Sequence, residues 1–582
     1  MARSIRRTVP STDTATDGRG PAAKISMKYS ARGVLVAAIG ILIPSFLEAQ
    51  QDTVREGWRM VPMDPNMPMM PGLEGAVPGV SAFLPGLGIN FATIAEARPS
   101  ELVTLADGDT LDITVSLVRR ELQGHETVMF GYNGQYPGPM LQVPEDATVM
   151  VRVANQIEMP TTIHWHGIRL ENQFDGVPGI TQAAIQSGES FTYEVHVPDA
   201  GLFWYHPHVR EDVQQDLGLF GNMVVTPIEA DYYGPASREV AFVLDDILMD
   251  DSGVLPWGET APTHALMGRF GNVMMVNGET DHTLTAQTGE VIRFLMTNVA
   301  NSRTFNVTFG GAPVKLLASD VGRFEREQWI ESVVIGPAER YVVDVLFDQP
   351  GNFVIANTIQ AVNHFRGEFY PRVDTLSVVT ITDERAPSVA SERFQTLRTH
   401  QTVVDEINQF RPHFGRTPDY DLETTVRVQG LNPSIVLTME ADTLFVPPME
   451  WNDAMPMANW LSTGEQVTWV LRDRRTGAEN QEINWQFDQG DLVKLRIFNT
   501  PESFHPMNHP IHIHGQRFLV IALDGVQNQN LVWKDTAIVP VGSMMDVLVE
   551  MSNPGRWMLH CHIAEHLHTG MSLNFTVAEA SP

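Results

Sequence analysis

Short apolar runs that alternate with polar residues recur along the chain from about residue 98 onward. Typical runs are 109–118 and 147–155, and Gly, Pro, Asn or Asp separates such runs from their neighbours. Successive side chains of a strand point to opposite faces of its sheet, so these runs predict half-buried β-strands. The pattern repeats at 236–384 and again at 424–578. The chain is therefore predicted to be all-β, with three Greek-key β-sandwich domains.

Breaks in this pattern divide the 582 residues into segments. A chain of this length exceeds what one hydrophobic core supports, which agrees with about three domains. The expected segments are an N-terminal extension with a signal peptide at 1–49, an arm rich in Met, Pro and Gly at 50–97, sandwich domains at 98–232, 233–384 and 424–582, and a connecting segment with some helix at 385–423.

The N-terminal extension carries the features of an export signal. A basic stretch at 27–32 precedes an apolar run at 33–47, which is too short to span a membrane comfortably. We expect Met27 to be the true start, cleavage to occur near Ala49, and the protein to be periplasmic or extracellular. An uncleaved N-terminal anchor is the alternative, and no other segment is expected to enter a membrane.

The chain has a formal charge of −31, from 39 basic and 70 acidic residues. So acidic a surface disfavours nucleic acid and anionic membranes as partners, although acidic residues also serve solubility alone. The single cysteine excludes an internal disulfide framework. An exported protein of this kind would therefore depend on packing for its stability.

That single cysteine, Cys561, lies in the densest cluster of candidate metal ligands. On a strand its side chain faces one way, whereas those of His560 and His562 face the other way. His566 and Met571 follow at intervals of five residues. A thiolate, two imidazoles and a weak axial thioether form a blue-copper electron-transfer site. This segment supplies all of these ligands except the second imidazole.

Paired histidines occur in three other segments of the chain. Residues i and i+2 of a strand share a face, so each pair can bind one metal ion or bridge two. Together with His560 and His562 they provide eight imidazoles, the number that a three-copper cluster needs. The remaining histidine of these segments, His509, completes the ligand set of Cys561. The three pairs are His164 and His166, His206 and His208, and His512 and His514.

In this order the four motifs resemble those of the multicopper oxidases, the family of laccases, ascorbate oxidases, bilirubin oxidases and bacterial copper-efflux oxidases. The resemblance extends from about Tyr132 to Met571 and implies that the three domains are cupredoxin-like. It also implies that the first and third domains pack together around the cluster. The middle domain then acts as a spacer and can form part of the substrate wall.

The resemblance implies four copper ions, with O2 as co-substrate. His566 would be the copper ligand nearest to the surface and would accept electrons from substrate. Methionine at position 571 predicts a modest reduction potential, because a thioether stabilises oxidised copper relative to an apolar residue. The type 1 ligands would be Cys561, His509, His566 and Met571, the type 2 ligands His164 and His512, and the type 3 ligands His166, His206, His208, His514, His560 and His562.

Two acidic residues are candidate proton relays to bound oxygen. Asp175 matches an acid that lies beside the cluster in the family, and the alternative is a turn residue before Gly176. Glu565 lies inside the copper-binding segment and can relay protons or orient a ligand. Some bacterial relatives have an acid directly after the last copper histidine, where this chain has Leu567.

The other histidines show no metal pattern. His505 and His568 lie near the motifs but off their spacing, so we expect them on the surface or in support of a ligand. No metal role is expected for His125, His196, His264, His282, His364, His400 and His413.

The ligand set predicts an oxidase that takes single electrons from a reductant and delivers four of them to O2, which yields water. The favoured reductants are phenols and aromatic amines, as in laccases. The alternative is oxidation of Cu(I) or another metal ion for copper tolerance, because thioethers at Met60 to Met70, Met455 and Met457 suit Cu(I). A non-catalytic copper-binding protein needs no cysteine between two cluster ligands, and a copper nitrite reductase needs fewer histidines. We expect a monomer whose partner is a small-molecule reductant or Cu(I).

Overall fold

The computed structural model describes a large part of the chain after residue 82. The predicted signal peptide, the cluster at Met60 to Met70, and Met455 and Met457 lie outside the described residues. Among the residues that are described, no helix is long and apolar enough to cross a membrane. The described ranges are 83–86, 88–258, 261–363, 368–431, 449–451 and 465–580.

The first sandwich is built from strands between residues 102 and 226. One sheet has the order β1-β4-β9-β8-β6 and the other the order β3-β2-β5-β7. Val149, Val151 and Val153 alternate along β5 and are fully buried in the core, as their period of two predicts. The strands are β1 (Leu102–Thr104), β2 (Thr110–Leu122), β3 (His125–Tyr132), β4 (Met140–Pro144), β5 (Thr148–Asn155), β6 (His164–His166), β7 (Ser190–His196), β8 (Gly201–His206) and β9 (Gly221–Thr226).

The second sandwich has the sheet orders β13-β10-β15-β20-β17-β18 and β14-β22-β21-β16-β19. Phe242, Phe294 and Phe309 pack on one another in its core. The strands are β10 (Arg238–Ile247), β13 (Val273–Val276), β14 (Thr283–Thr288), β15 (Glu290–Asn298), β16 (Phe305–Phe309), β17 (Val314–Ser319), β18 (Arg323–Ile330), β19 (Ser332–Ile335), β20 (Arg340–Phe347), β21 (Gly351–Asn363) and β22 (Glu368–Arg385), with β24 (Met449–Trp451) beside β21 and a small ribbon of β11 (Met249–Asp250) and β12 (Gly253–Val254).

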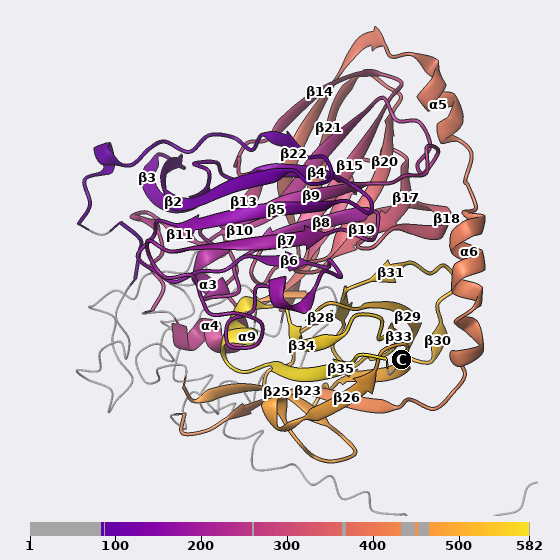
Figure 1. Ribbon diagram of the computed structural model, residues 1–582. Coiled ribbons are helices and arrows are strands. Elements are labelled where there is room, and N and C mark those ends of the chain that lie inside the picture. Colours follow the sequence, from indigo (N-terminus) through magenta and orange to yellow (C-terminus); the bar gives the residue numbers. More distant parts are fainter. Residues whose placement is uncertain are drawn as a thin grey trace, which may run out of the picture. The chain divides into compact units, whose positions relative to one another are not determined.

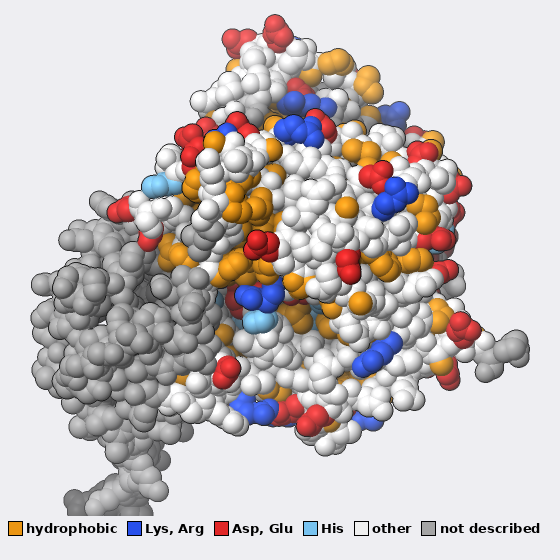
Figure 2. All heavy atoms as spheres, turned by 60° about the vertical axis from the view of Figure 1, so that its left-hand side comes forward, with side chains coloured by type: hydrophobic (Ala, Val, Ile, Leu, Met, Phe, Trp, Pro, Cys, Tyr) orange, Lys and Arg blue, Asp and Glu red, His pale blue; other side chains and the backbone are white. Residues whose placement is uncertain are grey.

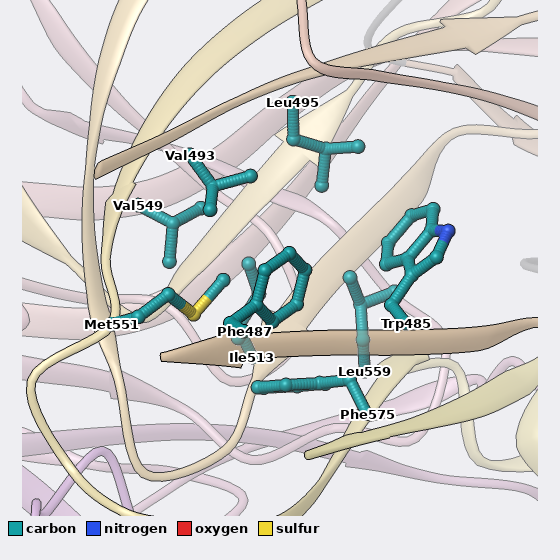
Figure 3. Close-up of a pocket in the computed structure, with 9 residues that line it drawn as sticks. All are labelled: Trp485, Phe487, Val493, Leu495, Ile513, Val549, Met551, Leu559 and Phe575. Carbon is teal, nitrogen blue, oxygen red and sulfur yellow. The ribbon is translucent and has the colours of Figure 1, made fainter. Parts of the chain in front are cut away.

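The third sandwich has the sheet orders β25-β23-β27-β33-β29-β30 and β26-β35-β34-β28-β32. A small void in its core is lined by apolar side chains alone, among them Trp485, Phe487 and Phe575, and it offers no group for chemistry (Figure 3). The strands are β23 (Tyr420–Val428), β25 (Val467–Asp473), β26 (Asn484–Asp488), β27 (Leu492–Asn499), β28 (His509–Ile513), β29 (Arg517–Leu523), β30 (Val526–Gln527), β31 (Trp533–Lys534), β32 (Thr536–Val539), β33 (Met544–Glu550), β34 (Gly555–Cys561) and β35 (Ser572–Ala578).

The three sandwiches repeat the same two parallel strand pairings. In one sheet of each sandwich, β2 pairs with β5, β10 with β15, and β23 with β27. In the other sheet, β4 pairs with β9, β14 with β22, and β26 with β35. Repetition of both pairings indicates three copies of one fold, and the prediction of an all-β protein is confirmed (Figure 1).

The helices of the described residues are short. α5 (Ser388–Phe394), α6 (Gln401–Asn408) and η3 (Arg411–His413) lie between the second and third sandwiches. α3 (Glu211–Gln214), α4 (Ala261–Met267) and α9 (Ala564–His568) lie side by side (Figure 1). They come from the parts of the chain that form the first, second and third sandwich, respectively. The single-turn helices are η1 (Phe91–Thr93), η2 (Asn172–Phe174) and η4 (Asn480–Glu482).

Charged side chains join the first sandwich to the third. Arg169 binds Asp199 through two hydrogen bonds of 2.7 and 2.8 Å, and its third nitrogen donates to Ser552 of the third sandwich at 2.8 Å. Arg517 of the third sandwich lies 3.7 Å from the same carboxylate and also pairs with Glu550.

Elsewhere on the surface, the face in Figure 2 shows acidic and basic side chains interspersed, so the acidic excess does not form a single patch there.

Replacing Asp199 with Asn is expected to lower the free energy of unfolding near neutral pH by about 1–3 kcal/mol, because charged hydrogen bonds are lost. Burial raises the pKa of Asp199, but the hydrogen bonds and charge of Arg169, together with Arg517, lower it below the ordinary value. The contribution is therefore complete above the ordinary pKa of about 3.9 and disappears as the pH falls through the lowered pKa. Denaturant unfolding at several pH values measures it, with the exposed Asp348→Asn as control. An equal loss at neutral and strongly acid pH would contradict the expectation.

Candidate metal centre

Cys561 ends β34 with its thiol between two histidines. Its Sγ lies 3.5 Å from Nδ1 of His509, at the start of the neighbouring strand β28, and 3.7 Å from Nδ1 of His566, on α9. The register of these strands sets Ile511 opposite Cys561. Met571 is fully buried, and its carbonyl oxygen accepts a hydrogen bond from the Cys561 amide at 3.1 Å. We call Cys561, His509, His566 and Met571 the Cys561 site.

The protonation of this site fits a bound cation. Burial raises the pKa of the Cys561 thiol far above its ordinary value, so the thiolate needs a positive partner. A coordinated metal ion supplies one, since it deprotonates the thiol that binds it. Burial also lowers the pKa of His509 to about 3 and that of His566 well below its ordinary value. Both imidazoles are therefore neutral, which is the form that binds metals.

His566 is covered by residues from two other elements. Its ring stacks on Trp469 of β25, with ring centroids 3.9 Å apart, and the indole nitrogen donates to the carbonyl of Ala265 on α4 at 2.8 Å. His566 is 0% exposed and Trp469 is equally buried. The burial of His566 is shared by the other predicted copper ligands, and its role as the ligand nearest to the surface stays a prediction.

Four strand ends bring eight imidazoles into one buried space. In the first sandwich, β6 pairs with β8, which sets His164 opposite His206. In the third sandwich, β28 pairs with β34, which sets His512 opposite His560. The two sets interleave, because His166 stacks on His512 with ring centroids 3.8 Å apart. We call the eight buried residues the histidine cluster: His164, His166, His206, His208, His512, His514, His560 and His562.

The nitrogens of this cluster converge in sets suited to metal ions. Within each set, the ligand atoms lie within 4.8 Å of one another. One set contains both of the predicted type 2 ligands, and a carboxylate, Asp535, takes part in another. The sets are His164 with His512 and His514, His164 with His166 and His206, His208 with His514 and His560, and His166 with His512 and Asp535.

Unpaired ring nitrogens also point to a missing partner. Among the described residues, the Nε2 atoms of five cluster histidines are buried without a hydrogen bond, and such atoms are costly unless something binds them. Burial lowers the pKa of His562 to about 3, and it lowers the pKa of His206, His512, His514 and His560 well below the ordinary value, so these rings are neutral. Burial also acts to lower the pKa of His208, but the charge and hydrogen bond of Glu211 raise it above the ordinary value. Neutral imidazoles with converging free nitrogens are the donor set that copper ions need. The five are His164, His206, His208, His512 and His562.

His166 differs from these five in the nitrogen that it leaves free. Its Nε2 lies 3.0 Å from both Asp535 Oδ1 and Thr536 Oγ1, while its Nδ1 is buried without a partner in the described part of the chain. Arg340 of the second sandwich holds the same carboxylate at 2.7 Å, and all these groups are buried. Gly167 has a φ of +84°, and a Cβ there would collide with the Asp535 carboxylate. The second sandwich is therefore more than a spacer, because its guanidinium fixes the carboxylate behind a ligand.

Three family models, each described as multicopper oxidase, match residues 92–230, 228–373 and 438–581. The chain belongs to the multicopper oxidase family. The multicopper oxidase MmcO of Mycobacterium tuberculosis is 27% identical over 493 residues, which cover 80% of this chain and 86% of that protein. Laccase-1 of Botryotinia fuckeliana is 27% identical over 482 residues, covering 77% and 78%. The metallo-oxidase of Campylobacter jejuni has the same fold, with a TM-score of 0.61, 21% identity and coverage of 87% and 99%. The predicted resemblance is thus confirmed, and the chain is a copper-dependent oxidoreductase.

The two predicted proton relays of this multicopper oxidase lie in different surroundings. Asp175 is buried with Oδ2 2.9 Å from His514 Nδ1 and Oδ1 3.3 Å from His164 Nδ1. Glu565 binds Ser302 at 2.9 Å and approaches Asn301 at 3.4 Å, and in the described residues its side chain bonds no imidazole. Burial raises the pKa of Glu565 to about 8. The relay roles of both acids stay predictions.

Of the two histidines expected on the surface or in support of a ligand, His568 is exposed and His505 is fully buried. The charge of His505 lowers the pKa of His566, so the residue lies near the Cys561 site. The surface alternative is therefore wrong for His505. None of the described histidines without a metal pattern takes part in a ligand set, and His364 lies outside the described residues.

Several residues behind the ligands could not be found from the motifs. Asp535 and Arg340 lie far in sequence from His166, and nothing in their local pattern marks them. Glu211, in contrast, follows His208 by three residues, and its Oε1 lies 2.7 Å from His208 Nδ1. Among these residues, Glu211 alone could have been suspected from the sequence, because an acid three residues after a paired histidine can reach the ring of that histidine.

Replacing Arg340 with Gln is expected to lower the free energy of unfolding by about 3–5 kcal/mol, because Asp535 then stays buried without its cation. It should also weaken copper binding by about 10–100-fold, since Asp535 no longer holds His166 in place. Denaturant unfolding of the metal-free protein and copper content after dialysis measure the two effects. Arg293→Gln is the matched control, because it breaks the buried pair with Asp344 in the same sandwich, away from the cluster. Equal copper retention by the two variants would contradict the role of Arg340.

Proposed function

We propose that this multicopper oxidase holds four copper ions, a type 1 copper at the Cys561 site and a three-copper group in the histidine cluster. The observation that carries the proposal is the position of Cys561 between His560 and His562 at the end of β34. The thiol faces one ligand set and the imidazoles face the other, so one strand serves both. When bound, the copper ions supply the single-electron steps that together reduce O2 to water.

The side chains and backbone of β34 keep the two sites close and dry. Nδ1 of His560 lies 2.9 Å from the carbonyl oxygen of Cys561, which fixes the ring of the residue directly before the cysteine. The amide of His562 donates to Pro510 on the neighbouring strand at 2.7 Å. All three residues are buried, and the exclusion of water limits the escape of partly reduced oxygen.

As reductants we propose phenols and aromatic amines, which agrees with the presence of a laccase among the relatives. Such substrates give up one electron without a covalent contact to the protein. The protein is further proposed to be exported to the periplasm or the cell exterior, and to act as a monomer without nucleic-acid or membrane partners.

A second candidate reductant is Cu(I), which the burial of His566 favours. Trp469 and α4 separate His566 from a phenol, so the phenol could not touch this ligand. A metal ion bound on the outer side of Trp469 and α4 could instead pass its electrons on to the Cys561 site. Reduced copper prefers thioether ligands. Oxidation of Cu(I) would make the protein a metal oxidase in copper tolerance.

Oxygen uptake by the copper-loaded protein separates these candidates. Uptake is compared with Cu(I) and with a dimethoxyphenol, each with and without added Cu(II). Fast phenol oxidation that ignores added Cu(II) would support a laccase. Fast Cu(I) oxidation, with phenol oxidised only when Cu(II) is added, would support the metal oxidase. No uptake with either reductant, in protein that holds four coppers, would contradict both substrate proposals.

Replacing Cys561 with Ser is expected to abolish the blue colour and oxygen uptake together, because the hydroxyl does not replace the thiolate at the type 1 site. Absorption spectra, copper content and oxygen uptake measure the loss. His568→Ala serves as control, since this exposed histidine lies on the same short helix as His566 and should leave colour and uptake unchanged. Oxygen uptake that persists in the serine variant would contradict the proposed path of electrons.

A further inference from the structure

For three histidines of the cluster a carboxylate oxygen lies within 3.0 Å of a ring nitrogen, whereas for others a backbone carbonyl is the nearest oxygen. His164 has both, because Asp175 Oδ1 lies 3.3 Å from its Nδ1. His164, His206 and His512 each turn Nδ1 toward a backbone carbonyl at 2.8–2.9 Å. His560 does the same through the carbonyl of Cys561. The three histidines with a carboxylate behind them are His166 with Asp535, His514 with Asp175, and His208 with Glu211.

Glu211 reaches His208 through a tight reversal of the chain. His208 lies two residues beyond β8, and Glu211 opens α3. Between them Arg210 adopts a left-handed conformation, with φ 48° and ψ 56°, which residues other than glycine rarely adopt. The reversal returns the carboxylate to Nδ1 of the ligand at 2.7 Å, with both side chains at most 10% exposed.

The three carboxylates differ in whether a cation offsets them. Asp535 is held by the Arg340 guanidinium. In the described part of the chain, no lysine or arginine pairs with Glu211, because the neighbouring Arg210 binds Asp212 instead, at 2.8 and 2.9 Å. In the same part of the chain, the ion-pair partners of Asp175 are imidazoles and include no lysine or arginine.

Both uncompensated carboxylates support the same ligand set. His208, His514 and His560 converge on one candidate metal position, and Glu211 and Asp175 lie behind two of the three. The carboxylate behind His166, in contrast, pairs with the guanidinium of Arg340, which also lies 3.5 Å from Asp320. The two sides of the predicted type 3 pair therefore lie in unequal electrostatic surroundings.

We propose that Glu211 is a positioning residue that fixes His208 as a strong donor and adds a negative charge at the position formed by His208, His514 and His560. The inference rests on the proposed function, because it concerns copper in the histidine cluster. A carboxylate that accepts the Nδ1 proton orients the ring and makes Nε2 more basic. Added negative charge favours the doubly charged cupric ion over the cuprous ion. A copper ion at this position would therefore have a lower reduction potential than the other copper ion of the predicted type 3 pair.

The test compares Glu211→Gln with Glu211→Ala. Glutamine keeps an oxygen that can accept from His208 Nδ1 but removes the charge, whereas alanine removes both. The expected result is that Glu211→Gln retains four coppers, while its near-ultraviolet band from the coupled pair is reduced at a higher potential than in the wild type. Glu211→Ala should also lose one copper about 10–100-fold more readily on dialysis. The blue band of the Cys561 site is the internal reference and should keep its potential in both variants.

The double variant Arg210→Gln, Asp212→Asn is the matched control, since it removes the neighbouring ion pair of the same turn without touching His208 and without freeing Arg210 to pair with Glu211. An equal shift in this variant would overturn the proposal, because the effect would then belong to the turn and not to the bond between Glu211 and His208. Unchanged potential and copper retention in Glu211→Gln and Glu211→Ala would also overturn it. If Glu211→Ala does not fold, Glu211→Gln and the double variant decide the question. Wild-type protein that fails to bind four coppers would instead refute the proposed function.

Discussion

The burial of eight imidazoles in one space is the constraint on which the rest of the structure depends. Each ring brings a nitrogen that finds no hydrogen bond among the described residues or finds another imidazole, as with Nε2 of His514 and His560, which lie 3.0 Å apart. A buried polar atom without a partner costs about 1–3 kcal/mol. The surrounding sheets must therefore hold an arrangement that is unfavourable until metal ions bind. Half of the rings come from each of two sandwiches, so the contact between these sandwiches determines whether the cluster forms at all.

The second sandwich carries no copper motif, yet it contacts both ligand sets from behind. Arg340 reaches the carboxylate that holds His166, and Ser302 binds Glu565 beside His566. Trp469, which covers His566, is in turn anchored to Ala265 of α4. Residues from the middle of the chain thus determine the orientation of a ligand at one end and the access to a ligand at the other.

The local spacing of residues predicted the strands and the paired histidines, because each depends on neighbours along one strand. Asp175 was found through the resemblance to the family. A period of two places His164 and His166 on one face whatever the rest of the chain does. The burial of His566 could not be predicted in this way, since it results from a ring on β25 and a helix that follows another sandwich. The same reason hid Asp535 and Arg340, which approach His166 only after three sandwiches have packed.

The register of β34 links the two sites more tightly than proximity alone would. Its pairing with β28 sets Cys561 opposite Ile511 and His560 opposite His512, so thiol and imidazole emerge on opposite faces. A slip of one residue would turn every side chain to the other face and would remove the cysteine from one site and the histidines from the other. The pairing with β35 on the other side, where His560 lies opposite Ser572, gives β34 a second neighbour that specifies the same register. A central strand with two partners is therefore a physical requirement of an arrangement in which one segment serves the Cys561 site and the histidine cluster together.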